Sequence, residues 1–213
     1  MRTLALDQLK TVLCLGAHSD DIEIGCGGTI LRLVAENPGV TVHWVVFSSD
    51  DARAAEATAS AQRFLSGAAD ANVEIHRFRD GFLPYDGAKV KAYFEELKRR
   101  IDPDLIFTHH GDDLHQDHRL VNELTWNTFR NHLILHYEIP KYDGDLGRPN
   151  LYVHLEPARV EEKVRILMEC FPSQSDKAWF SEDLFLGLMR MRGMESNAPT
   201  GHAEGFFARK VCL

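Results

Sequence analysis

The feature that most constrains the fold is a regular alternation of short apolar, β-branched runs with segments of helical periodicity, which continues as far as residue 129. Four runs are expected strands: 11–17, 40–47, 73–78 and 105–109. Four segments that follow them are expected helices: 27–36, 53–65, 89–101 and 120–129. Alternation of this kind is typical of βαβ units, in which parallel strands are joined by crossover helices. The sequence therefore predicts a mostly parallel sheet.

The last third of the chain extends this pattern without a visible boundary. Further strands are expected at 132–139, 152–155 and 205–212, and further helices at 160–170 and 183–192. A chain of 213 residues is long enough to bury one complete hydrophobic core. We find no internal repeat, low-complexity linker or change of composition. We therefore predict a single α/β domain over residues 1–213, a Rossmann-like three-layer sandwich.

The charge balance excludes one class of partner. The formal net charge is −8, and no run of Lys and Arg stands out along the chain. A protein that binds the phosphate backbone needs a surplus of positive charge on one face, so we expect no nucleic-acid partner. No apolar run approaches the roughly 20 residues that cross a bilayer, so we expect no membrane span.

The cysteines indicate a cellular compartment. Cys14, Cys26, Cys170 and Cys212 show no paired CxxC spacing, and we expect buried, reduced thiols. The apolar stretch near the N-terminus is interrupted by charges and makes a poor signal peptide. Together these features predict a cytoplasmic protein.

The first segment that carries chemistry follows the first expected strand. It contains His18, Asp20 and Asp21, and leads into the glycine-rich stretch 25–28. Ligands of open α/β sheets bind at the carboxyl ends of the strands, and we expect the glycines to let the backbone turn sharply there. A helix N-cap at Asp20 or Asp21 is the structural alternative. Dinucleotide binding is disfavoured because the GxGxxG spacing is absent and the two carboxylates would repel a pyrophosphate.

The second segment, residues 109–118 (HHGDDLHQDH), follows the fourth expected strand and packs four His and three Asp into ten residues. A solvated polar loop is the alternative. Imidazole and carboxylate are ligands for zinc, and a catalytic zinc site uses three protein ligands and leaves one position open. A metal in such a site lowers the pKa of a bound water towards about 7, and a nearby carboxylate can accept its proton. Two such loops at one sheet edge can converge on a single ion, as a hydrolytic site requires.

At these two segments the sequence resembles the LmbE/PIG-L family of zinc-dependent de-N-acetylases, which includes N-acetylglucosaminyl deacetylases. AHSDDIEIGCGG at 17–28 is similar to the family pattern AHPDD(E) followed by GxGG, and HQDH at 115–118 is similar to HxDH. The resemblance implies that Zn2+ is the cofactor and that His18, Asp21 and His118 are its ligands. The implied substrate is a small N-acetylated molecule, most often a sugar.

The resemblance also assigns roles beyond the metal. It implies that Asp20 is the general base, that His115 stabilises the oxyanion or donates a proton, and that Asp117 orients a histidine. Arg53, in the segment RAAEA, matches a family arginine that lies near the substrate. Asp113 stands where some members have a tyrosine that acts as general acid, so the resemblance leaves the proton donor to the leaving amine open, and His115 is the preferred candidate.

Several properties are left open at this point. Ser19 replaces a usual Pro and Ile22 a common Glu, and neither change removes a proposed ligand. A second hydrolase with the same zinc site, an amidase acting on a thiol S-conjugate, is an alternative to the sugar deacetylase. A non-catalytic metal-binding relative is another. Assembly into a homo-oligomer and the choice between zinc and other divalent ions are not decided by the sequence.

Overall fold

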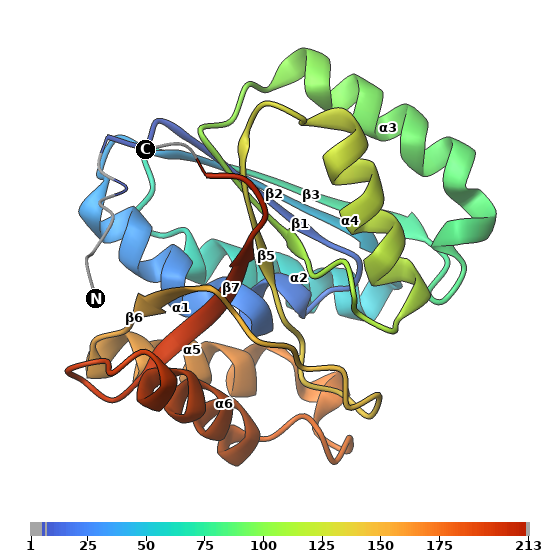
Figure 1. Ribbon diagram of the computed structural model, residues 1–213. Helices are drawn as coiled ribbons and strands as arrows, with labels where there is room; N and C mark the ends of the chain where they lie inside the picture. Colours follow the sequence, from blue (N-terminus) through green and yellow to red (C-terminus); the bar gives the residue numbers. More distant parts are fainter. Residues whose placement is uncertain (1–5, 7, 212–213) are drawn as a thin grey trace.

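In the computed structural model, which describes residues 6 and 8–211, the predicted mostly parallel sheet is present and has seven strands (Figure 1). Five are parallel: β1 (Thr11–Gly16), β2 (Thr41–Ser48), β3 (Asp70–Phe78), β4 (Leu105–His109) and β5 (Leu133–Tyr137). Two more strands complete one edge: β7 (Ala203–Ala208) is antiparallel to both of its neighbours, β5 and β6 (Leu151–His154). The strand order is β3-β2-β1-β4-β5-β7-β6, so the direction of winding reverses between β1 and β4. Such a reversal opens a crevice at the carboxyl ends of these two strands.

Helices cover both faces of the sheet, which confirms the three-layer α/β sandwich (Figure 1). One face carries α3 (Gly87–Arg100) and α4 (Gln116–Thr128). The other carries α1 (Asp21–Glu36), α2 (Asp51–Phe64), α5 (Pro157–Cys170) and α6 (Glu182–Glu195). Two short 3-10 segments, Leu83–Asp86 and Pro172–Gln174, lie in connections.

The central strand β1 shows why both layers are needed. Val12 and Cys14 belong to the core under α1, whereas Leu13 and Leu15 belong to the core under α3 and α4. Successive side chains of a strand point to opposite faces, so an uninterrupted apolar run is buried only when both faces are covered. The apolar run that predicted a buried strand is therefore satisfied on both sides.

All six α-helices among the described residues begin earlier than the periodicity predicted, and two of them, α1 and α4, begin four or more residues earlier. The first begins at Asp21 rather than Gly27, so the glycine-rich stretch lies inside α1 and does not form the sharp turn we expected. Gly25 is needed for close packing instead, because a Cβ there would lie 2.2 Å from Cδ2 of Tyr137. Likewise, α4 begins at Gln116 rather than Leu120, which places the end of the second motif in a helical turn.

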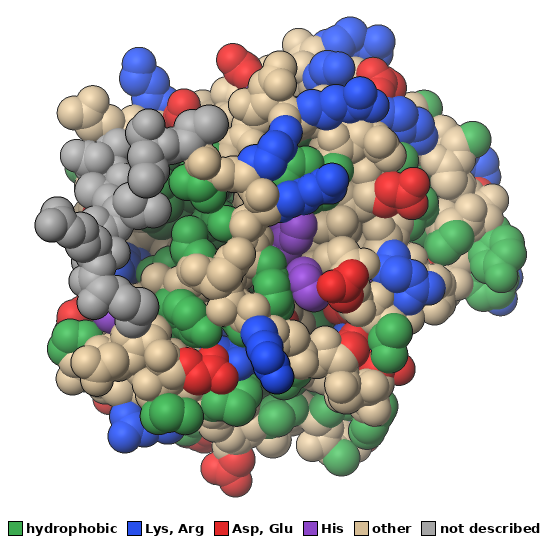
Figure 2. Space-filling model, in the orientation of Figure 1, with side chains coloured by type: hydrophobic (Ala, Val, Ile, Leu, Met, Phe, Trp, Pro, Cys, Tyr) green, Lys and Arg blue, Asp and Glu red, His purple; other side chains and the backbone are tan. Residues whose placement is uncertain are grey.

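The cysteines, the last strand and the helix lengths can be compared with what the sequence predicted. Cys14, Cys26 and Cys170 are buried and free, as predicted, while Cys212 lies outside the described part of the chain. The last strand ends at Ala208, before the limit we expected. Within residues 6 and 8–211, no helix combines the length and apolar character needed to cross a membrane. Figure 2 shows Lys and Arg side chains gathered over α3, with Asp and Glu side chains interspersed.

Candidate metal centre and active site

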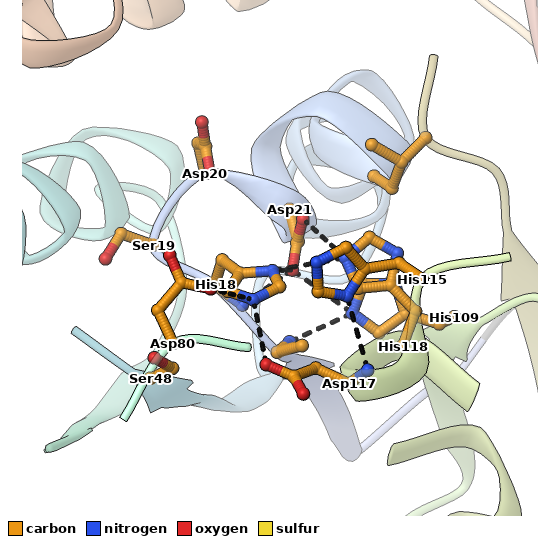
Figure 3. Close-up of polar contacts among 12 residues, drawn as sticks. His18, Ser19, Asp20, Asp21, Ser48, Asp80, His109, His115, Asp117 and His118 are labelled. Carbon is orange, nitrogen blue, oxygen red and sulfur yellow. Dashed lines mark hydrogen bonds and ion pairs between the residues drawn. The ribbon is translucent and has the colours of Figure 1, made fainter. Parts of the chain in front are cut away.

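The fold brings the two sequence motifs together at the crevice between β1 and β4. These strands are paired neighbours, with Cys14 opposite Phe107, so their carboxyl ends meet at one edge. His18 follows β1 by two residues, and His118 lies in the first turn of α4 after β4. In Figure 3, the side chains of His18, Asp21 and His118 point toward one another. The motifs are 100 residues apart in the chain, and the sheet order alone makes them adjacent.

The three predicted ligands lie within contact distance of one another. Nδ1 of His18 is 3.1 Å from Nε2 of His118 and 3.2 Å from Oδ2 of Asp21. Nε2 of His118 is 3.5 Å from Oδ1 of Asp21. Bonds of about 2.0–2.2 Å in tetrahedral geometry separate ligand atoms by about 3.3–3.6 Å. The observed spacing is therefore close to the edge length of a zinc coordination shell.

The positions of the protons on His18 and His118 indicate whether a cation fits between them. Nε2 of His18 faces the carboxylates of Asp80 at 3.0 Å and Asp117 at 3.3 Å, so this nitrogen carries a proton and donates it. Nδ1 of His118 donates to Oδ2 of Asp113 at 2.9 Å for the same reason. In the neutral rings the remaining nitrogens then aim lone pairs at each other across 3.1 Å. Two lone pairs this close require a cation between them, either a proton or a metal ion.

The electrostatics of the centre agree with that requirement. Burial acts to lower the pKa of His18, but Asp21, Asp117 and Asp80 outweigh it and raise this pKa well above its ordinary value. Burial, together with the charge of His109, lowers the pKa of His118 to about 3. Burial would raise the pKa of Asp21, yet the neighbouring histidines hold it well below its usual range. Without a metal, the shared proton resides on His18, and a metal ion would replace it.

His109 is a buried histidine to which sequence reasoning assigned no role. Its Nε2 lies 3.2 Å from Oδ2 of Asp21, and its ring stacks on that of His118 with 3.9 Å between centroids. That same Nε2 accepts the backbone N–H of Ala17 at 2.9 Å, so its lone pair is already used. We therefore describe His109 as a wall of the site and leave it out of the proposed ligand set, although it forms a possible metal-binding group with Asp21 and His118. In the sequence, its position as the last residue of an expected strand could have indicated that it lies at the site.

His115 lies over the cluster from the N-cap position of α4. Its ring centroid is 4.8 Å from that of His18 and 4.6 Å from that of His118. Its Nδ1 accepts the backbone N–H of Asp117 at 3.2 Å, which leaves the proton of the neutral ring on Nε2. Burial and the charge of His18 lower the pKa of His115, so the ring is neutral near pH 7. A neutral ring in this position offers one N–H donor.

The histidine that Asp117 contacts is His18, whose Nε2 lies 3.3 Å from Oδ2 of Asp117. The Asp117 side chain is fully buried, and its oxygens also accept the backbone N–H groups of Gly81 at 2.8 Å and Leu83 at 3.1 Å. Asp80, which sequence reasoning missed, reaches Nε2 of His18 from the same loop after β3. These two carboxylates therefore fix the ring of His18 and tie the β3–α3 connection to the site.

Asp20 and Arg53 pair with each other beside the cluster. Nη2 of Arg53 donates to Oδ1 of Asp20 at 2.7 Å, while Oδ2 of Asp20 is buried without a partner. Burial raises the pKa of Asp20, and Arg53 opposes part of that rise. Asp20 occupies the N-cap position of α1, but its side chain makes no capping hydrogen bond. In Figure 3 its carboxylate stands apart from the imidazole rings.

Comparison with known proteins identifies a family and a relative of this chain. The family model described as GlcNAc-PI de-N-acetylase (PIG-L) matches residues 13–129, more than half of the chain. The uncharacterized deacetylase YaiS of Escherichia coli K12 is 28% identical over 142 residues, which cover 62% of this chain and 75% of that protein. Both motifs lie inside the region that the family model matches.

Solved structures share the architecture at low identity. GalB, the 4-carboxy-2-hydroxymuconate hydratase of Pseudomonas putida KT2440, has a TM-score of 0.78 at 18% identity and covers 96% of this chain and 98% of its own. N,N'-diacetylchitobiose deacetylase from Pyrococcus horikoshii has a TM-score of 0.68 at 23% identity and covers 94% of this chain and 84% of its own. At such identities the likeness establishes the fold, and one fold can serve different reactions.

Proposed function

Because the chain belongs to the PIG-L family, whose model is described as GlcNAc-PI de-N-acetylase, we propose that it is a zinc-dependent deacetylase acting on an N-acetylated sugar or sugar-containing metabolite. One observation carries the proposal: Nδ1 of His18 and Nε2 of His118 face each other across 3.1 Å, and the carboxylate of Asp21 has an oxygen within 3.5 Å of each of these nitrogens. The N-acetylated sugar is supported by the names of the family model and of the chitobiose deacetylase.

The residues at this point would hold the metal. His18, Asp21 and His118 would supply two nitrogens and one oxygen, a donor set that suits Zn2+ and would leave a coordination position open. An ion bound there would act as a Lewis acid that polarises the acetyl carbonyl and brings the pKa of water from about 15.7 towards about 7. We propose zinc because imidazole nitrogen dominates the set, although several divalent ions accept such ligands.

Asp20 and His115 then divide the proton chemistry. We assign the unpartnered Oδ2 of Asp20 to accept the proton of the attacking water, since its raised pKa suits a base. Nε2–H of His115 would donate a hydrogen bond to the carbonyl oxygen as that oxygen becomes negative. A neutral His115 has no spare proton, so the proton held by Asp20 passes to the leaving nitrogen as the C–N bond breaks. Acetate and an amine are the products.

Arg53 is the residue we propose to contact substrate. Its Nη2 holds Asp20, while its Nε is buried without a partner and remains available to an acceptor. A guanidinium can bind two acceptors at once, so Arg53 could hold the base and a substrate oxygen together. We further propose a small-molecule substrate and a cytoplasmic location, the latter supported by the free, buried thiols at Cys14, Cys26 and Cys170.

The test is a hydrolysis assay on zinc-loaded protein with a panel of N-acetylated sugars and N-acetylated thiol S-conjugates, read as acetate and amine release. We expect turnover of a sugar, and we expect Asp20→Asn to bind zinc normally but lose at least about 100-fold in kcat, the usual contribution of a general base. Asp112→Asn, a matched charge change on a side chain that is 94% exposed, should keep full activity. Full activity in the Asp20 variant would refute the base assignment.

The same assay separates the alternatives. Turnover confined to the S-conjugates would identify the amidase and refute the sugar deacetylase. Stoichiometric zinc without hydrolysis of any compound in the panel would identify a metal-binding relative without this activity. A likeness to the hydratase GalB requires one further control, the addition of water to an unsaturated carboxylate, followed by loss of its ultraviolet absorbance.

A further inference from the structure

Asp113 makes contacts that a general acid would not make. Its carboxylate is buried, and Oδ2 accepts the Nδ1–H of His118 at 2.9 Å. Oδ1 accepts the backbone N–H of His115 at 2.8 Å, which closes a turn within the second motif. Asp113 therefore contacts one predicted zinc ligand directly and the backbone of the residue over the cluster. Both of its oxygens are engaged, and neither carries a free proton.

A lysine from another loop holds this carboxylate in place. Nζ of Lys141, four residues beyond the end of β5, lies 2.9 Å from Oδ2 of Asp113 and 2.5 Å from Oδ2 of Asp145. Asp145 in turn accepts the backbone N–H of Leu114 at 2.8 Å. The side chains of Lys141 and Asp145 are 11% and 5% exposed, so this is a buried network. It ties the loop after β5 to the second motif.

We propose that Asp113, held by Lys141 and Asp145, is a positioning residue that aims Nε2 of His118 at the metal and keeps its proton on Nδ1. The inference rests on the metal site of the proposed function. A carboxylate behind a ligating histidine fixes its tautomer and ring orientation, and loss of such a partner costs about 10–100-fold in metal affinity. Asp113 thus supports the metal and takes no part in protonating the leaving amine.

The two zinc histidines would then be held by separate partners. His18 is oriented by Asp80 and Asp117, and His118 by Asp113. Lys141 balances the charge of Asp113, whose carboxylate would otherwise be buried with only the N–H groups of His118 and His115 against it. The chain therefore uses a carboxylate and a lysine at a position where some members have a tyrosine.

The test compares Asp113→Asn with Asp112→Asn. Asparagine keeps the size of the side chain and an oxygen for the N–H of His115, so the turn is retained while the charge behind His118 is lost. We expect zinc affinity, measured by competition with a chromophoric chelator, to fall about 10–100-fold in Asp113→Asn and to change less than twofold in Asp112→Asn. Nitrogen-15 NMR of the metal-free protein should show His118 protonated on Nδ1 in the wild type and mixed tautomers in the variant.

A second variant covers the case in which Asp113→Asn does not fold. Lys141→Met keeps the aliphatic stem and removes the charge, and we expect it to weaken zinc binding and alter the visible spectrum of the Co2+-substituted protein. Unchanged zinc affinity and an unchanged His118 tautomer in both variants would overturn the inference. Because no substrate enters these measurements, zinc binding without deacetylation refutes the proposed function alone, whereas a wild-type protein that binds no zinc refutes both.

Discussion

The buried ion pair between Lys163 and Glu204 connects three elements that support the metal centre. Nζ of Lys163, on α5, lies 2.6 Å from Oε1 of Glu204, on β7, and 2.6 Å from the carbonyl oxygen of Ile24, on α1. Glu204 also accepts the backbone N–H groups of Gly28 at 2.9 Å and Thr29 at 2.7 Å. Helix α1, which begins at one of the proposed ligands, is thus fixed at its centre by two opposite charges.

Replacing Lys163 with Met should be strongly destabilising. Both side chains of the pair are 3% exposed, so the carboxylate of Glu204 would stay buried without its counter-charge. Breaking a buried pair in this way costs about 3–5 kcal/mol, a large fraction of a typical unfolding free energy of about 5–15 kcal/mol. For a chain of this size each kcal/mol lowers Tm by about 2–4 °C, so the expected loss is about 6–20 °C.

The assay is urea unfolding followed by circular dichroism, with a double variant and a surface control. Lys163→Met combined with Glu204→Gln removes both charges and keeps an acceptor for the α1 backbone, so it should recover much of the lost stability. Lys89→Met breaks an exposed pair with Asp86 and should change the unfolding free energy by less than about 1 kcal/mol. A loss below about 1 kcal/mol for Lys163→Met, or losses that simply add in the double variant, would refute the reasoning.

Three further predictions concern the site and its packing. His118→Ala should reduce bound zinc well below one equivalent by elemental analysis, and full occupancy would remove His118 from the ligand set. The raised pKa of His18 means that a proton occupies its Nδ1 in the metal-free protein, so zinc binding should release this proton and should weaken as the pH falls. Calorimetry in buffers of different ionisation enthalpy measures the release, and a finding of no released proton would contradict the prediction. Gly25→Ala places a Cβ 2.2 Å from the ring of Tyr137 and should lower the unfolding free energy by at least about 1–3 kcal/mol. The control Gly39→Ala, whose Cβ has no atom within 4 Å, should lower it by less than about 1 kcal/mol. Equal losses of unfolding free energy in the two variants would refute the packing argument.

The sequence was sufficient to predict that the two motifs lie at the same edge of the sheet. Each follows an apolar run that must be a buried strand, and the carboxyl ends of parallel strands share one edge of a sheet. The fold class followed from the same alternation of strands and helices. His18 and His118 meet because β1 and β4 pair, an arrangement that strand periodicity makes plausible but that only the sheet order establishes.

The starts of α1 and α4 could not be predicted from periodicity. The first turn of each helix contains polar residues of the candidate site: Asp21 in α1, and Asp117 and His118 in α4. These polar residues obscure the apolar periodicity that would indicate a helix. The glycines of α1 have low helix propensity, and the close approach of α1 to Tyr137 overrides it. Local sequence therefore indicated loops where tertiary packing gives helices.

The partners behind the histidines were hidden for a different reason. Asp80 and Lys141 come from loops after β3 and β5, and no motif spacing relates them to His18 or Asp113. Their positions depend on how each loop folds over the sheet edge. Asp113 was visible in the sequence, but its contact with His118 depends on the turn that precedes α4.

The early helix starts have an electrostatic consequence for catalysis. Both α1 and α4 direct their N-termini at the crevice, and the partial positive charge there favours anions over cations. In the proposed metal site, carboxylates offset that preference: Asp21 lies at the centre, and Asp80, Asp113 and Asp117 lie behind the two histidines. Under the proposed mechanism, the two helix ends would then favour the negative charge that develops on the acetyl oxygen as the amide is attacked. The residues that obscure the helix starts in the sequence are thus the residues that we propose to hold a metal ion in a crevice that also favours an oxyanion.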